Sequence, residues 1–286
     1  MPHPIPLFLP FMSLFITSLN SGSNGNCYYI GNDTEAVLVD AGISCRETEK
    51  RMKRLGLDMS KIKAVFISHE HGDHISGVET LANKYRLPVY ITAATLANSR
   101  LRINTQLVRG FAAYEPVSIG DLSVLAFPKL HDAIDPHSFV ISHKGVNVGV
   151  FTDIGSPCKH VIENFGKCHI AFLEANYDEY MLENGRYPIH LKRRISGDKG
   201  HLSNNQALEL FIKHKHPELS LLYLSHLSKD NNSPHLALDL FASFAEDTDI
   251  AVASRYKETP VSRVPTGIAA TNTDISPAET VQMSLF

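Results

Sequence analysis

The sequence has little net charge, few cysteines and no long apolar run. Its 286 residues carry a net charge of −3, so it lacks the strongly basic character of many nucleic-acid-binding domains, and contact with a polyanion would need a local basic patch. The four cysteines have no C-x-x-C spacing of a zinc ribbon and are too few for a disulfide scaffold. We therefore expect free thiols in a reducing cytoplasm.

The start of the chain does not have the features of a targeting signal. Residues 1–16 are apolar but carry no Lys or Arg, and four prolines interrupt them. The segment lacks the charged region and the cleavage site of a signal peptide, and it is too short to span a bilayer. We expect a cytoplasmic protein whose native start is Met12, with residues 1–12 as a non-native or disordered extension.

Short β-rich runs alternate with helical patterns from Phe15 onward. Ser44, Ser203 and Ser233 each stand where a helix N-cap is expected, and a proline suited to the first helical position follows the last of them. Many strands with few helices favour two sheets in one α/β domain over residues 13–256. The expected strands are residues 27–30, 36–39, 64–68, 88–92, 122–127, 138–142, 147–152, 170–174 and 219–224.

The character of the chain changes after Tyr256. Residues 257–284 are rich in Pro, Thr, Ala and Ser and have no hydrophobic period. Such a composition cannot bury enough apolar surface to fold by itself. The sequence therefore predicts a flexible, disordered tail over residues 257–286.

The central motif is S-H-E-H-G-D-H at residues 68–74, directly after an apolar run. His69 and His71 are two residues apart on extended chain and so point to the same side, while Asp73 and His74 follow on a turn and can face a second point. Imidazole and carboxylate groups suit Zn²⁺ or a similar ion. Chance rarely places four ligand-type residues at this spacing, so the motif predicts a site for two divalent metal ions.

Further ligand-type residues, His131, Asp153 and His226, stand at the ends of later expected strands. Strand ends are where open sheets place active sites. Asp40, which ends the expected strand 36–39, can orient a liganding imidazole from outside the first set of ligands. Taken singly, each could be an ordinary structural residue, because the chain has 15 histidines.

The complete pattern resembles the five motifs of the metallo-β-lactamase superfamily and covers roughly residues 13–245. The resemblance implies an αββα four-layer sandwich with a dinuclear site along one edge, loaded with Zn or Mn. The implied ligands of the first ion are His69, His71 and His131; those of the second are Asp73, His74 and His226; and Asp153 bridges the two.

Within the superfamily, several phrases resemble the YycJ/WalJ-like group of DNA exonucleases, which lack the extra domain of the larger nucleases. One departure is Asp230, where that group is expected to have Glu. The resemblance implies a metal-dependent phosphodiesterase, a DNA exonuclease of repair or replication. The matching phrases are residues 21–27 (SGSNGNC), 185–188 (GRYP), 191–195 (LKRRI), 200–204 (GHLSN) and 226–232 (HLSKDNN).

Two residues outside the metal cluster resemble catalytic residues of the superfamily. His201 resembles the histidine that transfer-RNA 3′-processing enzymes place on the scissile phosphate, and Glu174 resembles its carboxylate partner. We expect His201 to contact the phosphate and donate a proton, Glu174 to orient His201, and Asp73 to serve catalysis as well as metal binding. Alternatively, His201 and Glu174 are polar residues at the edge of a helix.

A cationic run, Lys192, Arg193 and Arg194, precedes the His201 loop. Such a run is often only a solvated face, but beside a phosphodiesterase site it favours neutralisation of a nucleic-acid backbone. The glycine-rich residues 21–26 are either a phosphate-binding loop that presents backbone N–H groups or a plain hairpin turn.

The last five residues resemble the pentapeptide by which bacterial repair and replication proteins bind the DNA sliding clamp. Two apolar anchors would fill a hydrophobic pocket, the glutamine amide would fix the register, and the tail would act as a tether. The resemblance implies a role such as strand excision after mismatch recognition, whereas the alternative is a frayed apolar terminus. The residues of the pattern are Gln282, Met283, Leu285 and Phe286.

The metal cluster by itself leaves other activities open. The same ligands can serve a small-molecule hydrolase of thioesters or lactams, or a ribonuclease. A third class is a recruitment factor with a vestigial site, whose signature would be a missing ligand, and none is missing. The basic run and the tail favour a polyanionic substrate, with DNA as the expected partner.

Overall fold

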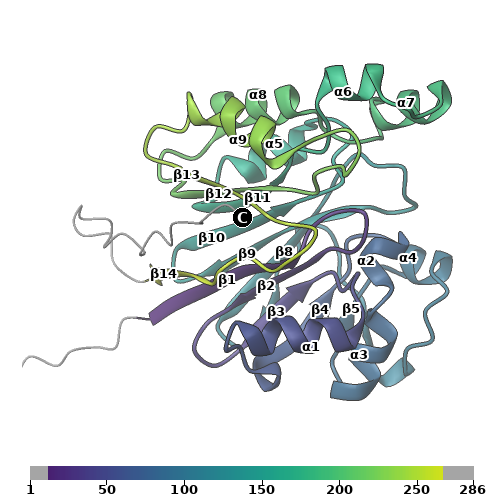
Figure 1. The fold of residues 1–286 in the computed structure, drawn as a ribbon. Helices are drawn as coiled ribbons and strands as arrows, with labels where there is room; N and C mark the ends of the chain where they lie inside the picture. The colour runs from purple at the N-terminus through teal and green to yellow at the C-terminus, as the bar shows by residue number, and fades with distance from the viewer. Residues whose placement is uncertain (1–11, 267–286) are drawn as a thin grey trace, which may run out of the picture.

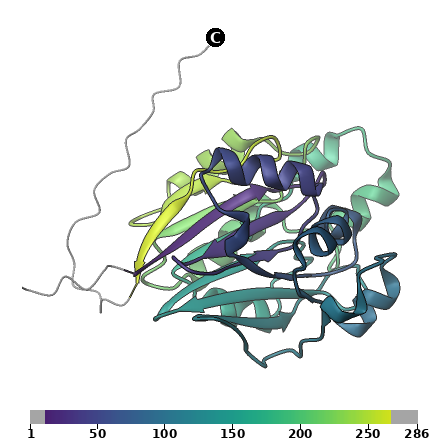
Figure 2. The same ribbon diagram turned by 90° about the horizontal axis from the view of Figure 1, so that it is seen from below.

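Two seven-stranded sheets pack face to face, and helices cover the outer face of each. The computed structural model, which describes residues 12–266, has four layers in the order α, β, β, α (Figure 1). Seen from below, helix α1 (Cys45–Arg54) lies across the outer face of one sheet (Figure 2). The predicted αββα sandwich is confirmed. No helix within residues 12–266 is long and apolar enough to cross a membrane.

The first sheet comes mainly from the N-terminal part of the chain. Strands β1 to β3 are antiparallel neighbours, whereas β3 to β6 run parallel. The carboxyl ends of the parallel strands therefore meet at one edge of the sheet. In order across the sheet, the strands are β14 (Ser262–Thr266), β1 (Met12–Asn20), β2 (Cys27–Gly31), β3 (Ala36–Val39), β4 (Ile62–Phe66), β5 (Val89–Tyr90) and β6 (Val108–Arg109).

The second sheet repeats this arrangement. Strands β7 to β10 are antiparallel neighbours, and β10 to β13 run parallel. Its parallel strands therefore also end at a common edge. In order across the sheet, the strands are β13 (Asp249–Val252), β12 (Leu221–Ser225), β11 (Ile170–Glu174), β10 (Val146–Phe151), β9 (His137–His143), β8 (Leu122–Pro128) and β7 (Val117–Ile119).

The helices begin where capping groups satisfy their free N–H groups. Ser44 accepts from the Glu47 N–H group, Ser203 forms a reciprocal capping box with Gln206, and Ser233 caps a helix with proline at its start, so the three predicted helices are confirmed. The sequence analysis missed six others, because helices of four to eight residues are too short to show a 3.6-residue period. Beyond α1, the helices are α2 (Gly72–Ile75), α3 (Val78–Tyr85), α4 (Ala93–Asn98), α5 (Lys159–Phe165), α6 (Glu179–Asn184), α7 (Ile189–Ile195), α8 (Asn204–His214) and α9 (Pro234–Ala242).

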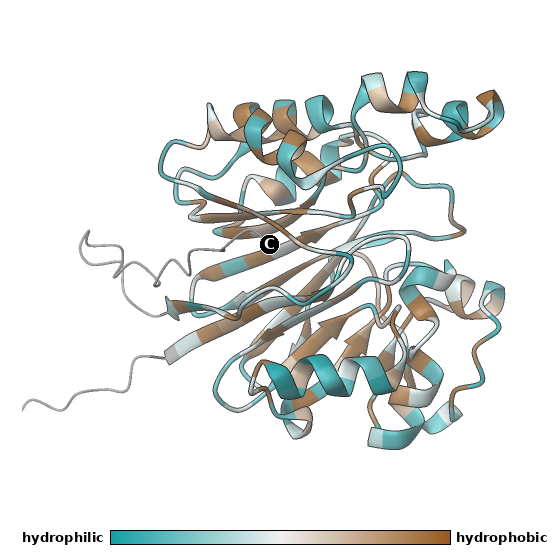
Figure 3. Cartoon of the chain, in the orientation of Figure 1, coloured by the Kyte–Doolittle hydropathy of each residue, from teal (hydrophilic) through white to brown (hydrophobic). Residues whose placement is uncertain are grey.

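Three apolar cores hold the four layers together. One lies between the two sheets, and each of the others lies between a sheet and its own helices. The strands are largely apolar, whereas the helices carry many hydrophilic residues (Figure 3). Aromatic rings join the two sheets: Phe66 contacts Phe139 with ring centroids 5.7 Å apart, and Tyr28 contacts Phe172 at 4.8 Å. These contacts fix the sheet edges relative to one another.

The folded domain extends past the predicted boundary at residue 256. Strand β14 pairs antiparallel with β1, and the Thr259 N–H group donates to the Ser18 carbonyl at 2.9 Å. Residues 257–266, which the sequence analysis assigned to the tail, therefore belong to the fold. The strand was missed because it contains Pro265, which an edge strand tolerates. Of the expected extension 1–12, residues 1–11 lie outside the described residues, whereas Met12 belongs to β1. The predicted clamp-binding residues 282–286 also lie outside the described residues.

Candidate metal centre

Three predicted site residues, each just after the carboxyl end of a strand, have an unusual backbone conformation. Asp40 after β3, Asp153 after β10 and His226 after β12 have φ angles of 59°, 56° and 54°. Residues other than glycine rarely adopt this left-handed region, at a cost of about 1–3 kcal/mol each. The chain therefore turns sharply as each strand ends, and the turn places these side chains over the edge where the two sheets meet.

The backbone of Asp73, in the short helix α2, contacts two other loops. The Asp73 carbonyl accepts from the Asn26 backbone N–H group at 2.7 Å, and a Cβ atom on Gly42 would lie only 1.7 Å from that same oxygen. Only glycine fits at position 42. In residues 21–26, the N–H groups of Ser21, Gly22, Gly25 and Asn26 are all bonded within the protein. The Asn26 N–H group positions the segment that carries Asp73, and none of the four groups is available to a phosphate.

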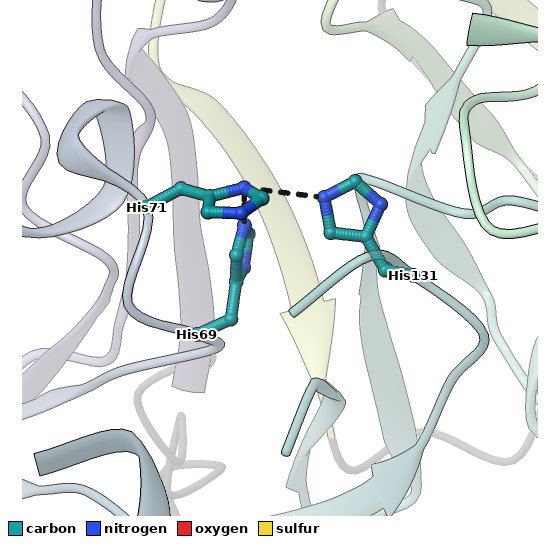
Figure 4. Close-up of side chains that lie close together, drawn as sticks. All are labelled: His69, His71 and His131. Carbon is teal, nitrogen blue, oxygen red and sulfur yellow. Dashed lines mark hydrogen bonds between the residues drawn. The ribbon is translucent and has the colours of Figure 1, made fainter. Parts of the chain in front are cut away.

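Three imidazole rings meet at one point of the centre. Nε2 of His69 lies 3.1 Å from Nδ1 of His71, which lies 3.4 Å from Nε2 of His131. The rings come from the loops after β4 and β8 and point toward one another (Figure 4). One ring nitrogen from each of the three histidines lies within 4.8 Å of the other two. Such a group can supply three of the ligands of a tetrahedrally coordinated divalent cation.

A second group of ligand-type residues lies beside the first. Oδ2 of Asp73 is 3.6 Å from Nε2 of His74 and equally far from Nε2 of His226. Asp153 lies between the two groups: its Oδ2 is 3.0 Å from Nε2 of His74, and its Oδ1 is 3.8 Å from Nε2 of His131. The structure thus brings all seven predicted ligands together.

Hydrogen bonds donated by Nδ1–H groups orient four of the imidazoles. The hydroxyl of Ser68 donates its proton to Asp40, so the contact between its oxygen and Nδ1 of His69 requires that His69 be the donor. Each Nδ1–H group is used in this way, which leaves Nε2 directed at the centre. The acceptors are Ser68 Oγ for His69 at 2.9 Å, Asp40 for His74 at 2.7 Å, the Gly200 carbonyl for His131 at 3.0 Å and Glu174 for His226 at 3.1 Å.

Two buried atoms at the centre show that a cation fits there. Oδ2 of Asp153 and Nε2 of His226 are buried and form no hydrogen bond, although Oδ2 of Asp153 lies 3.0 Å from Nε2 of His74. A buried polar atom without a partner costs about 1–3 kcal/mol. Both atoms are ligand types that divalent ions such as Zn²⁺ and Mn²⁺ accept. Coordination would satisfy them.

The electrostatics of the centre favour bound positive charge. Burial lowers the pKa of His131 to about 4 despite the nearby Asp153, so this ring is neutral and able to bind a metal near pH 7. At His74, burial lowers the pKa but Asp153 and Asp40 outweigh it and raise the pKa to about 10. Burial raises the pKa of Asp73, but His74 and His226 outweigh it and lower that pKa to about 2. The Asp73 carboxylate is therefore ionised and attracts a cation.

His201 and Glu174 form a pair beside the ligands. Nδ1 of His201 lies 2.7 Å from Oε1 of Glu174, whose Oε2 accepts the backbone N–H groups of Ile154 and Leu202. Glu174 is fully buried, whereas the His201 side chain is 22% exposed. The same carboxylate also contacts His226. Glu174 thus links the expected catalytic histidine to a predicted metal ligand, which the sequence alone did not indicate.

A cavity of about 440 Å³ opens onto these residues. Of the cationic run, only Arg194 lines it, and its Nε donates to Asp132 at 2.5 Å; the Lys192 ammonium instead donates to the Glu183 carbonyl. Tyr187 also lines the cavity and donates to Asp230 at 2.9 Å. The sequence analysis singled out neither Asp132 nor Tyr187, although Asp132 adjoins His131 in the chain.

We expect Asp40→Asn to lower the affinity for divalent ions about 10- to 100-fold. The carboxylate accepts from the Ser68 N–H and hydroxyl groups and from Nδ1 of His74, and an amide would place a second donor against one of these donors. Metal affinity is measured by chelator competition, with Asp33→Asn, an exposed loop residue, as control. Unchanged affinity in folded Asp40→Asn would contradict the assigned role.

Comparisons with known proteins agree with this geometry. The model of the beta-lactamase superfamily domain matches residues 35–226. The exodeoxyribonuclease YycJ of Bacillus anthracis is 34% identical over 249 residues, which cover 86% of this chain and 94% of that protein. The exodeoxyribonuclease WalJ of Streptococcus pneumoniae serotype 2 is 30% identical over 244 residues, 84% of this chain and 91% of that protein.

A solved structure shows the same fold. The metallo-beta-lactamase fold protein YhfI of Bacillus subtilis matches with a TM-score of 0.66 at 18% identity, over 88% of this chain and 99% of that chain. At this identity the likeness concerns the fold alone. Together with the family model and the two relatives, it shows that the chain belongs to the metallo-β-lactamase superfamily, in the group that includes the YycJ and WalJ proteins.

Proposed function

We propose that the protein is a metal-dependent phosphodiesterase that removes nucleotides from the ends of DNA. The observation that carries this proposal is the cavity, where a cluster of metal ligands, a histidine–carboxylate pair and an arginine face one space. The two relatives named exodeoxyribonuclease support DNA as the substrate. A hydrolase of thioesters or lactams would need the metal ligands but not the arginine, Arg194, that lines the cavity.

Two divalent ions, Zn²⁺ or Mn²⁺, are the proposed cofactors. When bound, such ions activate water near neutral pH and neutralise charge on the phosphoryl oxygens. The protein contributes preorganised ligands, because the Nδ1 partners described above fix the orientation of four of the imidazole rings. The proposed ligands are His69, His71 and His131 for one ion, Asp73, His74 and His226 for the other, and Asp153 between them.

The chain's own residues complete the proposed reaction. Glu174 holds His201 through Nδ1, so that Nε2 is free to contact a phosphoryl oxygen and to transfer a proton to the leaving 3′ oxygen. Arg194 reaches the cavity from α7 and can exchange its bond to Asp132 for a phosphate oxygen. A cavity of about 440 Å³ suits one or two nucleotides and not a duplex, which favours attack at a strand end.

The first test is digestion of end-labelled double-stranded DNA and matched RNA by the metal-loaded protein. We expect progressive loss of DNA ends, abolished by His71→Ala, which removes one of three converging imidazoles. His214→Ala, at the far end of α8 from the site, is the matched control. Intact metal content without any nuclease activity would instead favour a small-molecule hydrolase, and preferential loss of RNA would favour a ribonuclease.

A second test separates His201 from metal binding. We expect His201→Gln to lower kcat about 10²- to 10⁴-fold, because general acid catalysis contributes about that much. Metal content should stay unchanged, since His226 keeps its own bond to Glu174. Rates are measured on a diester with a nitrophenol leaving group and on DNA. Because nitrophenolate leaves without a proton, an equal loss on both substrates would argue against proton donation.

We further propose that the chain end binds the bacterial sliding clamp and that the enzyme acts in DNA repair, such as strand excision after mismatch recognition. The support is the sequence pattern of residues 282–286, separated by residues 267–281 from the end of β14. A linked docking motif raises the effective concentration of the enzyme at DNA without new contacts at the active site.

Leu285→Ala with Phe286→Ala tests this docking. We expect at least a tenfold loss of affinity for the purified clamp, because both apolar anchors are removed, and unchanged digestion of clamp-free DNA. Surface plasmon resonance measures the affinity, and Ser284→Ala, the spacer position, is the control. Equal clamp binding by the double variant and the full chain would refute the proposal.

A further inference from the structure

A second, smaller cavity of about 90 Å³ adjoins the metal-centre cavity. Ser228, two residues after His226, lines both cavities. The loop between β1 and β2 also runs between them, with Ser23 on the larger cavity and Ser21 on the smaller one. The two cavities are therefore adjacent, because Ser228 lines both and the β1–β2 loop contributes a residue to each.

Both charged residues that line the second cavity are cations. Lys229 and Arg255 line it, and no Asp or Glu does. Neither cation forms an ion pair within residues 12–266. Nη1 of Arg255 is also buried without a hydrogen-bond acceptor, and leaving such a donor unsatisfied costs free energy. By contrast, Arg54, on a solvated helix, pairs with Glu258. The Arg255 guanidinium lies over the Tyr256 ring, 6.0 Å from its centroid, but within the described residues neither cation has an anionic partner.

The chemistry of these groups selects a phosphate. A guanidinium and an ammonium with a neighbouring hydroxyl, here that of Ser228, form the donor set that binds phosphoryl oxygens in proteins. A nucleic-acid strand in a duplex carries one phosphate per about 3.4 Å of helix axis. A strand whose scissile phosphate lies at the metal centre must therefore place the next phosphate close by.

We propose that this cavity binds the backbone phosphate next to the scissile one, with Arg255 and Lys229 as its ligands. The inference rests on the proposed nuclease function and deepens it. A substrate with a flanking phosphate gains binding energy that a simple diester cannot gain. The subsite therefore makes the enzyme select a polynucleotide over small phosphodiesters, and it acts through binding and not through the chemical step.

Arg255→Gln combined with Lys229→Ala tests the subsite in the metal-loaded full chain. Two substrates are compared: oligothymidylate, and bis(p-nitrophenyl) phosphate, which has one diester and no flanking phosphate. We expect kcat/KM on the oligonucleotide to fall at least tenfold, mainly through KM, while the small diester is hydrolysed as before. Arg46→Gln with Lys53→Ala, an exposed pair on α1, is the matched control.

Equilibrium binding of a hydrolysis-resistant phosphorothioate oligothymidylate gives a readout that does not depend on turnover. We expect weaker binding by the variant, with a salt dependence of log K that is shallower by about 0.7 per lost phosphate contact on a single strand. Inorganic phosphate alone is the companion ligand. If the variant loses binding of inorganic phosphate but not of the oligonucleotide, the cavity serves a free anion and the proposal is overturned.

The remaining outcomes separate this inference from the nuclease function. Equal losses on both substrates would mean that the two residues only support the fold of the site. No loss on either substrate would leave the cavity without a role in binding. Either outcome overturns the proposed subsite. If the wild type binds the oligonucleotide through Arg255 and Lys229 yet cuts none, the subsite stands and the nuclease function fails.

Discussion

The buried carboxylate of Asp40 organises the metal centre. It is fully buried at the end of β3, and it accepts from the Ser68 N–H group, from the Ser68 hydroxyl and from Nδ1 of His74. Through Ser68 it also determines that His69 donates from Nδ1. One carboxylate thus turns two imidazoles so that both Nε2 atoms face the ligand cluster. Since these bonds fix the orientation of both rings, cation binding needs little rearrangement of the ligands.

Glu174 has the corresponding role at the end of β11 in the second sheet. Its two oxygens hold His201, His226 and two backbone N–H groups. The Gly200 carbonyl, adjacent to His201, meanwhile orients His131. The proposed acid and the metal ligands therefore share one network, which extends across both sheet edges. The apolar core between the sheets maintains these distances, since a shift of one sheet would separate donors from acceptors.

The candidate ligands could be singled out from the sequence because much of the chemistry is local. His69, His71, Asp73 and His74 lie within six residues, so their proximity does not depend on the fold. Helix caps could also be predicted from the sequence, because the side chains of Ser203 and Gln206 each accept a hydrogen bond from the other's backbone N–H group within one turn. The edge strand β14 and the short helices were missed because their stability comes from contacts with distant residues and not from their own pattern.

The sequence by itself determined the ligand types, the order of the strands that carry them and the presence of a basic run near the site. Only the tertiary structure decided which nitrogen of each imidazole faces the centre, that Arg194 and not Lys192 reaches the cavity, and that Arg255 lies beside Ser228 in a second cavity. The physical reason is that residue type sets what a group can bind, whereas hydrogen bonds and burial between segments far apart in the chain set its direction and its neighbours.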